Sequence, residues 1–175
     1  MLEKPVLIAY ASLTGSAKEI AEELERLFDA GGTPSEARDL NAVQDLSPYR
    51  AVIVGSAIRE EGWLPEAVEF VAKFQQQLKT LPVSYYLVSM TMYQDTPNHA
   101  QTALRYLRPV RQLVEPVEVG LFAGKFIPDE LTEAARQTLA GQGFPEGDWR
   151  DPAAVRAWGQ RVMELLKQES VAKGI

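Results

Sequence analysis

A hydroxyl-rich loop near the N-terminus has residue types that could bind a phosphate group. It reads Ser12-Leu13-Thr14-Gly15-Ser16-Ala17 and leads directly into an amphipathic helical pattern. The first turn of a helix has unpaired backbone N–H groups and lies at the positive end of the helix dipole. Side-chain hydroxyls can add further donors, so the loop could cradle a phosphate without a basic residue. A helix start capped by Thr14 or Ser16 explains the same residues without a ligand.

Two later loops each carry one large aromatic residue. Trp63 follows Ile58-Arg59-Glu60-Glu61-Gly62, and Tyr93 ends the sequence Met90-Thr91-Met92-Tyr93. A planar ring system could stack against one or both of these aromatic rings. Either ring could instead pack over its own loop or helix. The hydroxyl-rich loop and both aromatic-bearing loops are expected at one edge of the fold, and the three together favour a ligand site.

Other chemistries find little support in this sequence. It has no cysteine and one histidine, His99, which excludes disulfides, cysteine nucleophiles and multi-histidine metal sites. Residues 120–125 lack Walker A spacing, and no Gly-x-Ser-x-Gly elbow occurs. His99 is interpreted as a surface residue near a helix start. We therefore predict no catalytic side chain and no metal site.

The sequence between these loops alternates short apolar runs with longer amphipathic runs, which are the elements that must position the loops. Continuous apolar runs predict strands buried on both faces. Apolar residues on one helical face predict a helix beginning near residue 17. Proline and capping residues predict helices beginning near residues 65, 97 and 152, the second of these broken at Pro109. The expected fold is a three-layer α/β sandwich around a parallel sheet, with ligands at the carboxyl ends of the strands. The predicted strands are residues 5–10, 35–39, 51–56, 83–89 and 117–122.

Composition and charge indicate a single globular domain and argue against a nucleic-acid-binding or membrane-spanning protein. The chain has 175 residues, of which 46% are hydrophobic, so we expect a single domain over residues 1–175. The formal net charge is −6 and no basic patch is evident, which argues against nucleic acid as a partner. No apolar run approaches the length of a transmembrane segment, and no secretion signal is evident. The expected location is the cytoplasm.

The motifs together resemble the flavodoxin-like family. Residues 12–17 are similar to the flavodoxin phosphate loop, (Ser/Thr)-x-(Ser/Thr)-Gly-x-Thr, except that Ala17 replaces the final threonine. Within the family, the chain most resembles a subgroup related to menaquinone-dependent protoporphyrinogen oxidase. That likeness is carried by Gly55-Ser56-Ala57-Ile58-Arg59, Trp63-Leu64-Pro65-Glu66, Asp95-Thr96-Pro97, Leu121-Phe122-Ala123-Gly124 and Asp148-Trp149-Arg150-Asp151.

The resemblance implies a flavodoxin-like α/β/α sandwich with a five-stranded parallel sheet of order 2-1-3-4-5, and FMN as the cofactor. The phosphate would lie on the loop formed by Ser12, Leu13, Thr14, Gly15, Ser16 and Ala17. One side of the flavin ring would be lined by Ser56, Ala57, Ile58 and Trp63, and the other by Met90, Thr91, Met92 and Tyr93. The flavin would supply the redox chemistry, which suits a chain without an evident acid, base or nucleophile.

Three functions remain open from the sequence. The first is an FMN-binding protein that acts in electron transfer or as a small flavin-dependent oxidoreductase, for which the acidic charge suits a basic partner. The second is a protoporphyrinogen oxidase-type enzyme of haem biosynthesis, with a small quinone-like or porphyrin substrate. Residues 125–143 are short and polar, unlike the apolar and basic insert expected of that enzyme. The third is a flavodoxin-fold domain that no longer binds flavin, which Ala17 favours.

Overall fold

The apolar runs, together with the polar edge segment Ser35–Asp39, form a central parallel sheet in the computed structural model, which describes residues 2–174. Its five main strands lie in the order β2-β1-β3-β5-β6, and every neighbouring pair is parallel. The two-residue strand β4 (Gly62–Trp63) pairs only with β3, so the predicted order 2-1-3-4-5 is confirmed for the main strands. The main strands are β1 (Val6–Ala11), β2 (Ser35–Asp39), β3 (Ala51–Arg59), β5 (Val83–Val88) and β6 (Glu118–Phe122).

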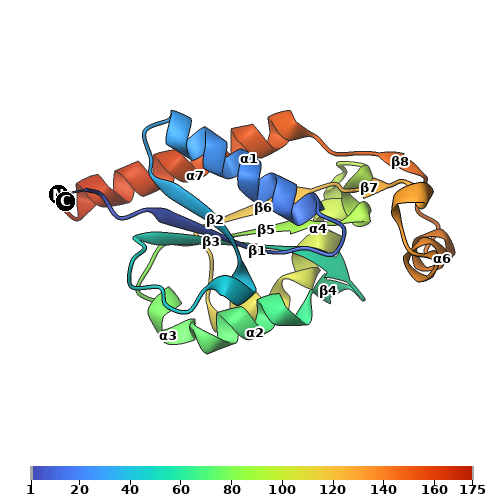
Figure 1. Ribbon diagram of the computed structural model, residues 1–175, viewed down its shortest axis with the longest axis horizontal. Helices are drawn as coiled ribbons and strands as arrows, with labels where there is room; N and C mark the ends of the chain where they lie inside the picture. Colours follow the sequence, from blue (N-terminus) through green and yellow to red (C-terminus); the bar gives the residue numbers. More distant parts are fainter. Residues whose placement is uncertain (1, 175) are drawn as a thin grey trace.

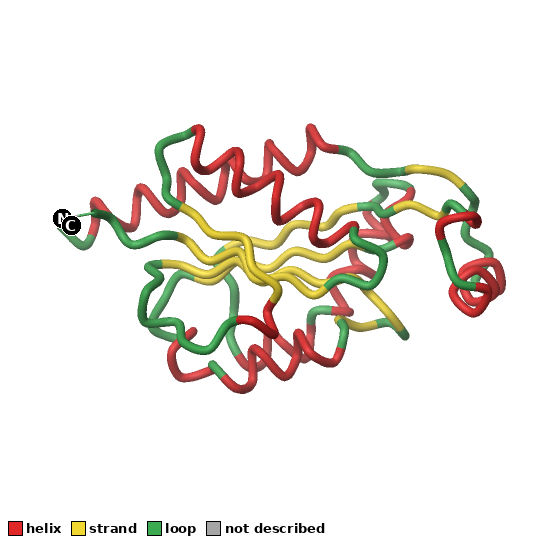
Figure 2. The backbone as a smooth tube through the Cα atoms, in the orientation of Figure 1, coloured by secondary structure: helices red, strands yellow, loops and turns green. Residues whose placement is uncertain are grey.

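Helices cover both faces of the sheet, as the buried strands require (Figure 1). Helices α1 (Ser16–Ala30) and α7 (Pro152–Ala172) pack together on one face. The other face is covered by α2 (Pro65–Lys73), α3 (Gln75–Leu78), α4 (Pro97–Tyr106) and α5 (Arg108–Leu113). The three layers are visible edge-on in Figure 2. The predicted sandwich is therefore confirmed.

The sheet separates two apolar cores because side chains alternate along each strand. The neighbouring residues Tyr85 and Tyr86 show the alternation, since both are fully buried but on opposite faces. Tyr86 packs beside Phe122 and Trp158 under α1 and α7. Tyr85 lies in the core beneath α2 and α5.

The helix boundaries follow their proline and capping residues. Pro109 lies in the first turn of α5 and separates it from α4, as predicted. Asp151 caps α7 by accepting a hydrogen bond of 3.1 Å from the Ala154 N–H, also as predicted. The amphipathic run after Pro65 is divided at Phe74 into α2 and α3. One continuous helix there was expected and is not found.

A small excursion leaves the sandwich after β6. It contains β7 (Lys125–Phe126), η3 (Pro128–Glu130), α6 (Glu133–Gly141) and β8 (Gly147–Asp148), with β7 and β8 paired antiparallel. Figure 1 shows α6 standing away from the sandwich, at the edge where the parallel strands end. Lys125 and Glu130 form an ion pair of 2.5 Å that holds η3 against β7. The excursion thus projects from the edge at which ligands are expected.

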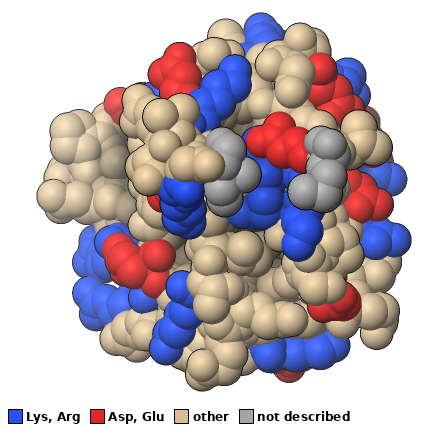
Figure 3. All heavy atoms as spheres, turned by 90° about the vertical axis from the view of Figure 1, so that its left-hand side faces the viewer, with Lys and Arg blue, Asp and Glu red and all other residues tan. Residues whose placement is uncertain are grey.

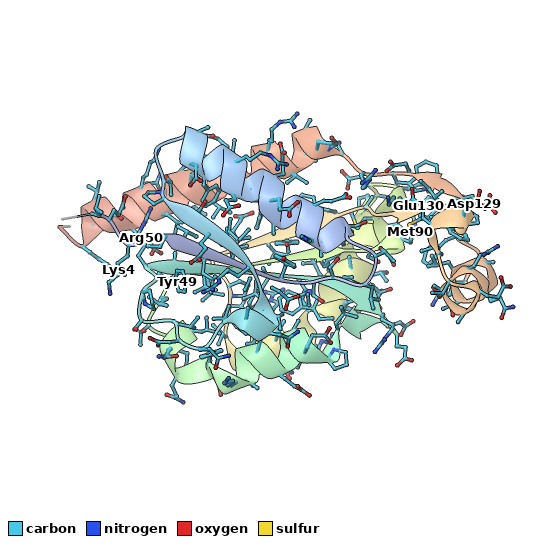
Figure 4. All side chains as sticks on the ribbon, in the orientation of Figure 1. Lys4, Tyr49, Arg50, Met90, Asp129 and Glu130 are labelled. Carbon is cyan, nitrogen blue, oxygen red and sulfur yellow. The ribbon has the colours of Figure 1, made fainter. Side chains whose placement is uncertain are left out.

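The two ends of the sheet differ in what they carry. Figure 4 places Lys4, Tyr49 and Arg50 at the amino ends of the strands, and Met90, Asp129 and Glu130 at the opposite end. On the face shown in Figure 3, which includes the amino ends, basic and acidic side chains are interspersed.

Within residues 2–174, no helix is long and apolar enough to cross a membrane. No cluster of metal-binding side chains occurs in that same part of the chain.

Candidate functional site

The first loop connects β1, the strand next to the centre of the sheet, to α1. Gly15 has a left-handed backbone (φ 95°) and is the N-cap of α1, so the expected caps Thr14 and Ser16 are wrong. The Gly15 N–H donates 2.9 Å to the Ser12 hydroxyl, which closes the turn inside the loop. No side chain caps α1. The backbone N–H groups of its first turn are therefore left for another acceptor.

The space in front of α1 is open. A Cβ atom built on Gly15 would meet nothing within 4 Å. Leu13 is 52% exposed and Thr14 is also exposed, whereas Ser16 and Ala17 are buried in the first turn. A compact anion could therefore approach the helix end over Gly15 without displacing a side chain. This arrangement fits the phosphate cradle expected from the loop sequence.

A buried tyrosine, Tyr86, supports this first turn from the core through a hydrogen bond, and we call this contact the brace. The Tyr86 hydroxyl donates 2.7 Å to the backbone oxygen of Ala17. The Tyr86 ring lies over Gly55 so closely that a Cβ there would be 1.8 Å from it. Burial raises the pKa of Tyr86 far above its ordinary value of 10, so the hydroxyl remains a donor. The brace joins α1 to the two central strands β3 and β5.

The second loop is a tight hairpin and not the open loop expected after Ser56. β3 continues to Arg59 and turns back through Glu60 and Glu61, whose φ angles are 52° and 61°. Ser56 is fully buried. Its hydroxyl donates 2.7 Å to the Ala57 oxygen and accepts 3.1 Å from the Leu64 N–H. The Ser56 hydroxyl thus stabilises the hairpin from inside the fold.

The hairpin turns Trp63 away from the edge of the sheet. Trp63 pairs with Ile58 and is only 4% exposed. Its ring packs edge-on against Tyr85, with centroids 5.0 Å apart and planes at 76°. The expectation that Trp63 presents its ring at the ligand-bearing edge is wrong, because antiparallel pairing directs the ring into the core beneath α2. Ala57 and Ile58, which are half-buried, remain at the base of the hairpin.

The third loop is the short 3-10 helix η2 (Met90–Tyr93). The Ser89 hydroxyl caps it by accepting 3.0 Å from the Thr91 N–H. Met90, Thr91 and Met92 are buried, and Tyr93 is half-buried. Of the two aromatic residues expected at the ligand edge, Tyr93 is the one found there. The rings of His99, Trp149 and Phe144 lie around Tyr93 at centroid distances of 5.5, 5.9 and 6.2 Å.

The segment that leads from β8 into α7 links the first loop to the third. We call residues 148–150 the strap. Trp149 packs edge-on against Tyr93 of η2. Arg150 forms an ion pair with Glu19 in the first turns of α1, and it contacts Asp148 through two hydrogen bonds of 2.8 and 2.6 Å. These bonds hold the pKa of Asp148 at about 2, below its ordinary value of 3.8.

A groove of about 510 Å³ opens where α1, α7 and the strap meet. Its apolar floor includes Ile20, Phe122 and Val155, and its rim carries side chains of both signs. Of the residues that line the groove, Ser16 was expected at the phosphate site, whereas Asp148-Trp149-Arg150-Asp151 was noted as a motif only and was not expected at the site. The groove brings together Ser16, Glu19, Asp148, Arg150 and Asp151.

Comparison with known proteins agrees with this arrangement of strands and helices. A family model described as a flavodoxin domain matches residues 7–141. The chain belongs to the flavodoxin family. No curated protein sequence matches this flavodoxin-family chain. The narrower likeness to the protoporphyrinogen oxidase subgroup is not supported by these comparisons.

Solved structures of flavodoxins share the fold at low sequence identity. The flavodoxin of Fusobacterium nucleatum bound to flavin mononucleotide has a TM-score of 0.56 and 14% identity, over 93% of this chain and 98% of that one. A flavodoxin from the domain Archaea has a TM-score of 0.55 and 14% identity, over 93% and 99%. Rubredoxin:oxygen oxidoreductase from Desulfovibrio gigas has a TM-score of 0.51 and 16% identity over 94% of this chain. This chain spans 37% of that protein.

Proposed function

We propose that this flavodoxin-family chain binds FMN at the carboxyl edge of its sheet and acts in electron transfer or as a small flavin-dependent oxidoreductase. The observation that carries the proposal is the uncapped first turn of α1, which follows β1 and faces open space over Gly15. Bound there, FMN would supply the capacity to accept and donate electrons. The described side chains bind and orient it.

The residues of the first loop suit a phosphate monoester. Backbone N–H groups at a helix start and nearby hydroxyls are the donors that phosphate oxygens require. Thr14 is exposed and Ser12 half-buried, so both hydroxyls lie at the surface of the loop. The methyl group of Ala17 is fully buried in the core. The missing threonine at this position therefore leaves the backbone donors unchanged, which argues against a domain that has lost its flavin.

We propose that the flavin ring lies between the hairpin and η2. Ala57 and Ile58 are at the base of the hairpin, and Tyr93 is half-buried at the end of η2. Aromatic side chains contact planar ligands through their faces and edges. Tyr93 is held by three other rings, so its orientation would be fixed before the ligand arrives. Trp63, Ser56, Met90, Thr91 and Met92 would support this region from the interior.

A protoporphyrinogen oxidase-type activity remains a second sequence-based hypothesis, but no described contact favours it over electron transfer. Oxidation of protoporphyrinogen by the FMN-loaded protein, above a free-flavin control, would be required to support it.

We further propose that residues 1–175 act as one domain. We also propose that this domain exchanges electrons with a redox partner protein and works in the cytoplasm.

Titration of the protein with FMN tests the proposed cofactor. Gly15→Trp places an indole ring in the open space before α1 and should abolish FMN binding, measured by the change in flavin fluorescence. Gly32→Trp is a matched control, because Gly32 also has a positive φ (75°) and open space, but lies at the other end of α1. Both variants should lose similar stability. FMN affinity that Gly15→Trp leaves unchanged would refute the phosphate site.

A further inference from the structure

We infer that Arg150 is a specificity residue that makes the site prefer flavins with a phosphate group over those without one. It would do so by cancelling the negative charge of Glu19 beside the first turn of α1. The inference rests on the proposed FMN function and adds a determinant outside the phosphate loop. Arg150 lies 131 residues from Glu19 in the sequence, so only the fold brings the two together.

The direction of the Glu19 side chain places its charge near the expected phosphate. Side chains on an α-helix lean toward the N-terminus and cover the preceding turn. Glu19 lies three residues after Ser16, the first residue of α1, and both line the same groove. An unpaired carboxylate there would repel a phosphate at the helix start, because both are anions. Some compensation of Glu19 is therefore needed for tight binding.

Arg150 supplies that compensation from the strap. Its guanidinium contacts the Glu19 carboxylate through one nitrogen and Asp148 through two others. Asp148 holds it in a two-pronged contact that fixes the plane of the guanidinium. The hydrogen bonds that Arg150 donates to Asp148 and Glu19 raise its pKa further above the ordinary value, so the guanidinium stays charged. Loss of Arg150 would remove the ion-pair partner of Glu19 and would leave Asp148 with the charge of Lys125 across the β7–β8 ladder.

The other cations near α1 are engaged elsewhere. Lys18 lies 3.9 Å from Glu22 on the exposed side of the helix. Arg26 and Arg156 both pair with Glu23, at 2.8 and 3.1 Å, one turn beyond Glu19. Arg156 lies in α7, and its side chain is 50% exposed, against 33% for Arg150. Its pair with Glu23 therefore offers a control ion pair to α1 that does not involve the strap.

Parallel titrations with FMN and riboflavin test the inference, because the two flavins differ only in the phosphate. Arg150→Gln should lower FMN affinity about tenfold, or about 1.4 kcal/mol, and change riboflavin affinity less than twofold. Arg150→Lys keeps the charge and should keep most of the preference. Adding Glu19→Gln to Arg150→Gln should restore FMN affinity to within about threefold of the unmodified protein. Arg156→Gln should leave both affinities unchanged.

The outcomes separate this inference from the proposed function. Failure of the unmodified protein to bind FMN refutes the proposed function, and the inference falls with it. If that protein binds FMN, equal losses of FMN and riboflavin affinity in Arg150→Gln show that Arg150 only holds the strap in place, which overturns the inference. An unchanged FMN affinity overturns it as well. Thermal melting of each variant confirms that the proteins compared are folded.

Discussion

The Tyr86 hydroxyl and the Ala17 carbonyl oxygen are 2.7 Å apart, which joins the centre of the sheet to the first turn of α1. The Tyr86 ring packs directly on Gly55, which has no side chain and so leaves room for the ring. The position of the proposed phosphate site therefore depends on contacts in the core between the sheet and helices α1 and α7, as well as on the loop sequence. A local sequence motif alone does not contain this constraint.

Tyr86→Phe should separate support of the site from general stability. Loss of a buried hydrogen bond should lower the free energy of unfolding by about 1 kcal/mol and FMN affinity by a few-fold. Tyr85→Phe is the control, because the Tyr85 hydroxyl donates 2.8 Å to the Val114 oxygen on the opposite face of the sheet. It should cost similar stability and leave FMN affinity unchanged. Urea unfolding and FMN titration measure the two effects, and equal FMN losses would contradict the assignment.

Gly55→Ala should be severely destabilising, because the new methyl group would overlap the Tyr86 ring. Overpacking of a rigid core typically costs about 1–3 kcal/mol, and we expect the upper end of that range. Gly62→Ala places its methyl group in open space and should change stability by less than about 0.5 kcal/mol. Chemical denaturation compares them. Similar midpoints for the two variants would contradict the close packing of Tyr86 on Gly55.

The hairpin between β3 and β4 should gain stability from better turn residues. Glu60 and Glu61 both have positive φ angles, a conformation that favours asparagine and glycine in two-residue hairpins. The double substitution Glu60→Asn and Glu61→Gly should therefore raise the free energy of unfolding by about 1 kcal/mol. Urea unfolding measures the gain. A loss of stability would show that the glutamate side chains make contacts that outweigh the backbone strain.

The strap should be sensitive to acid. Asp148 has a pKa of about 2 in the folded protein, against an ordinary value of 3.8. A depressed carboxyl pKa stabilises the fold above the unfolded pKa, and this contribution disappears as the pH falls from about 4 through 2. An NMR titration of the Asp148 carboxyl should show a midpoint near 2. Arg150→Gln should move that midpoint upward, and an unchanged midpoint would contradict the ion pair as its cause.

The parts of the fold that depend on local pattern were predictable. Continuous apolar runs marked β1, β3 and β5, and Pro109 marked the break between α4 and α5. The burial of Trp63 was not predictable, since a two-residue turn made of glutamates lacks the usual glycine or asparagine signal. The ion pair between Arg150 and Glu19 was not predictable either, because it depends on the path of the chain from the excursion back to α1.

The excursion differs from the sandwich in how much apolar surface it buries. No residue of α6 is buried, and β7 and β8 contribute only two residues each to their ladder. Segments with so little burial open locally at a small fraction of the global unfolding free energy. Amide hydrogens of α6 should thus exchange well before those of the central sheet. Because the strap contacts both Glu19 and Tyr93, one such opening would release the two loops together while the sheet remains folded.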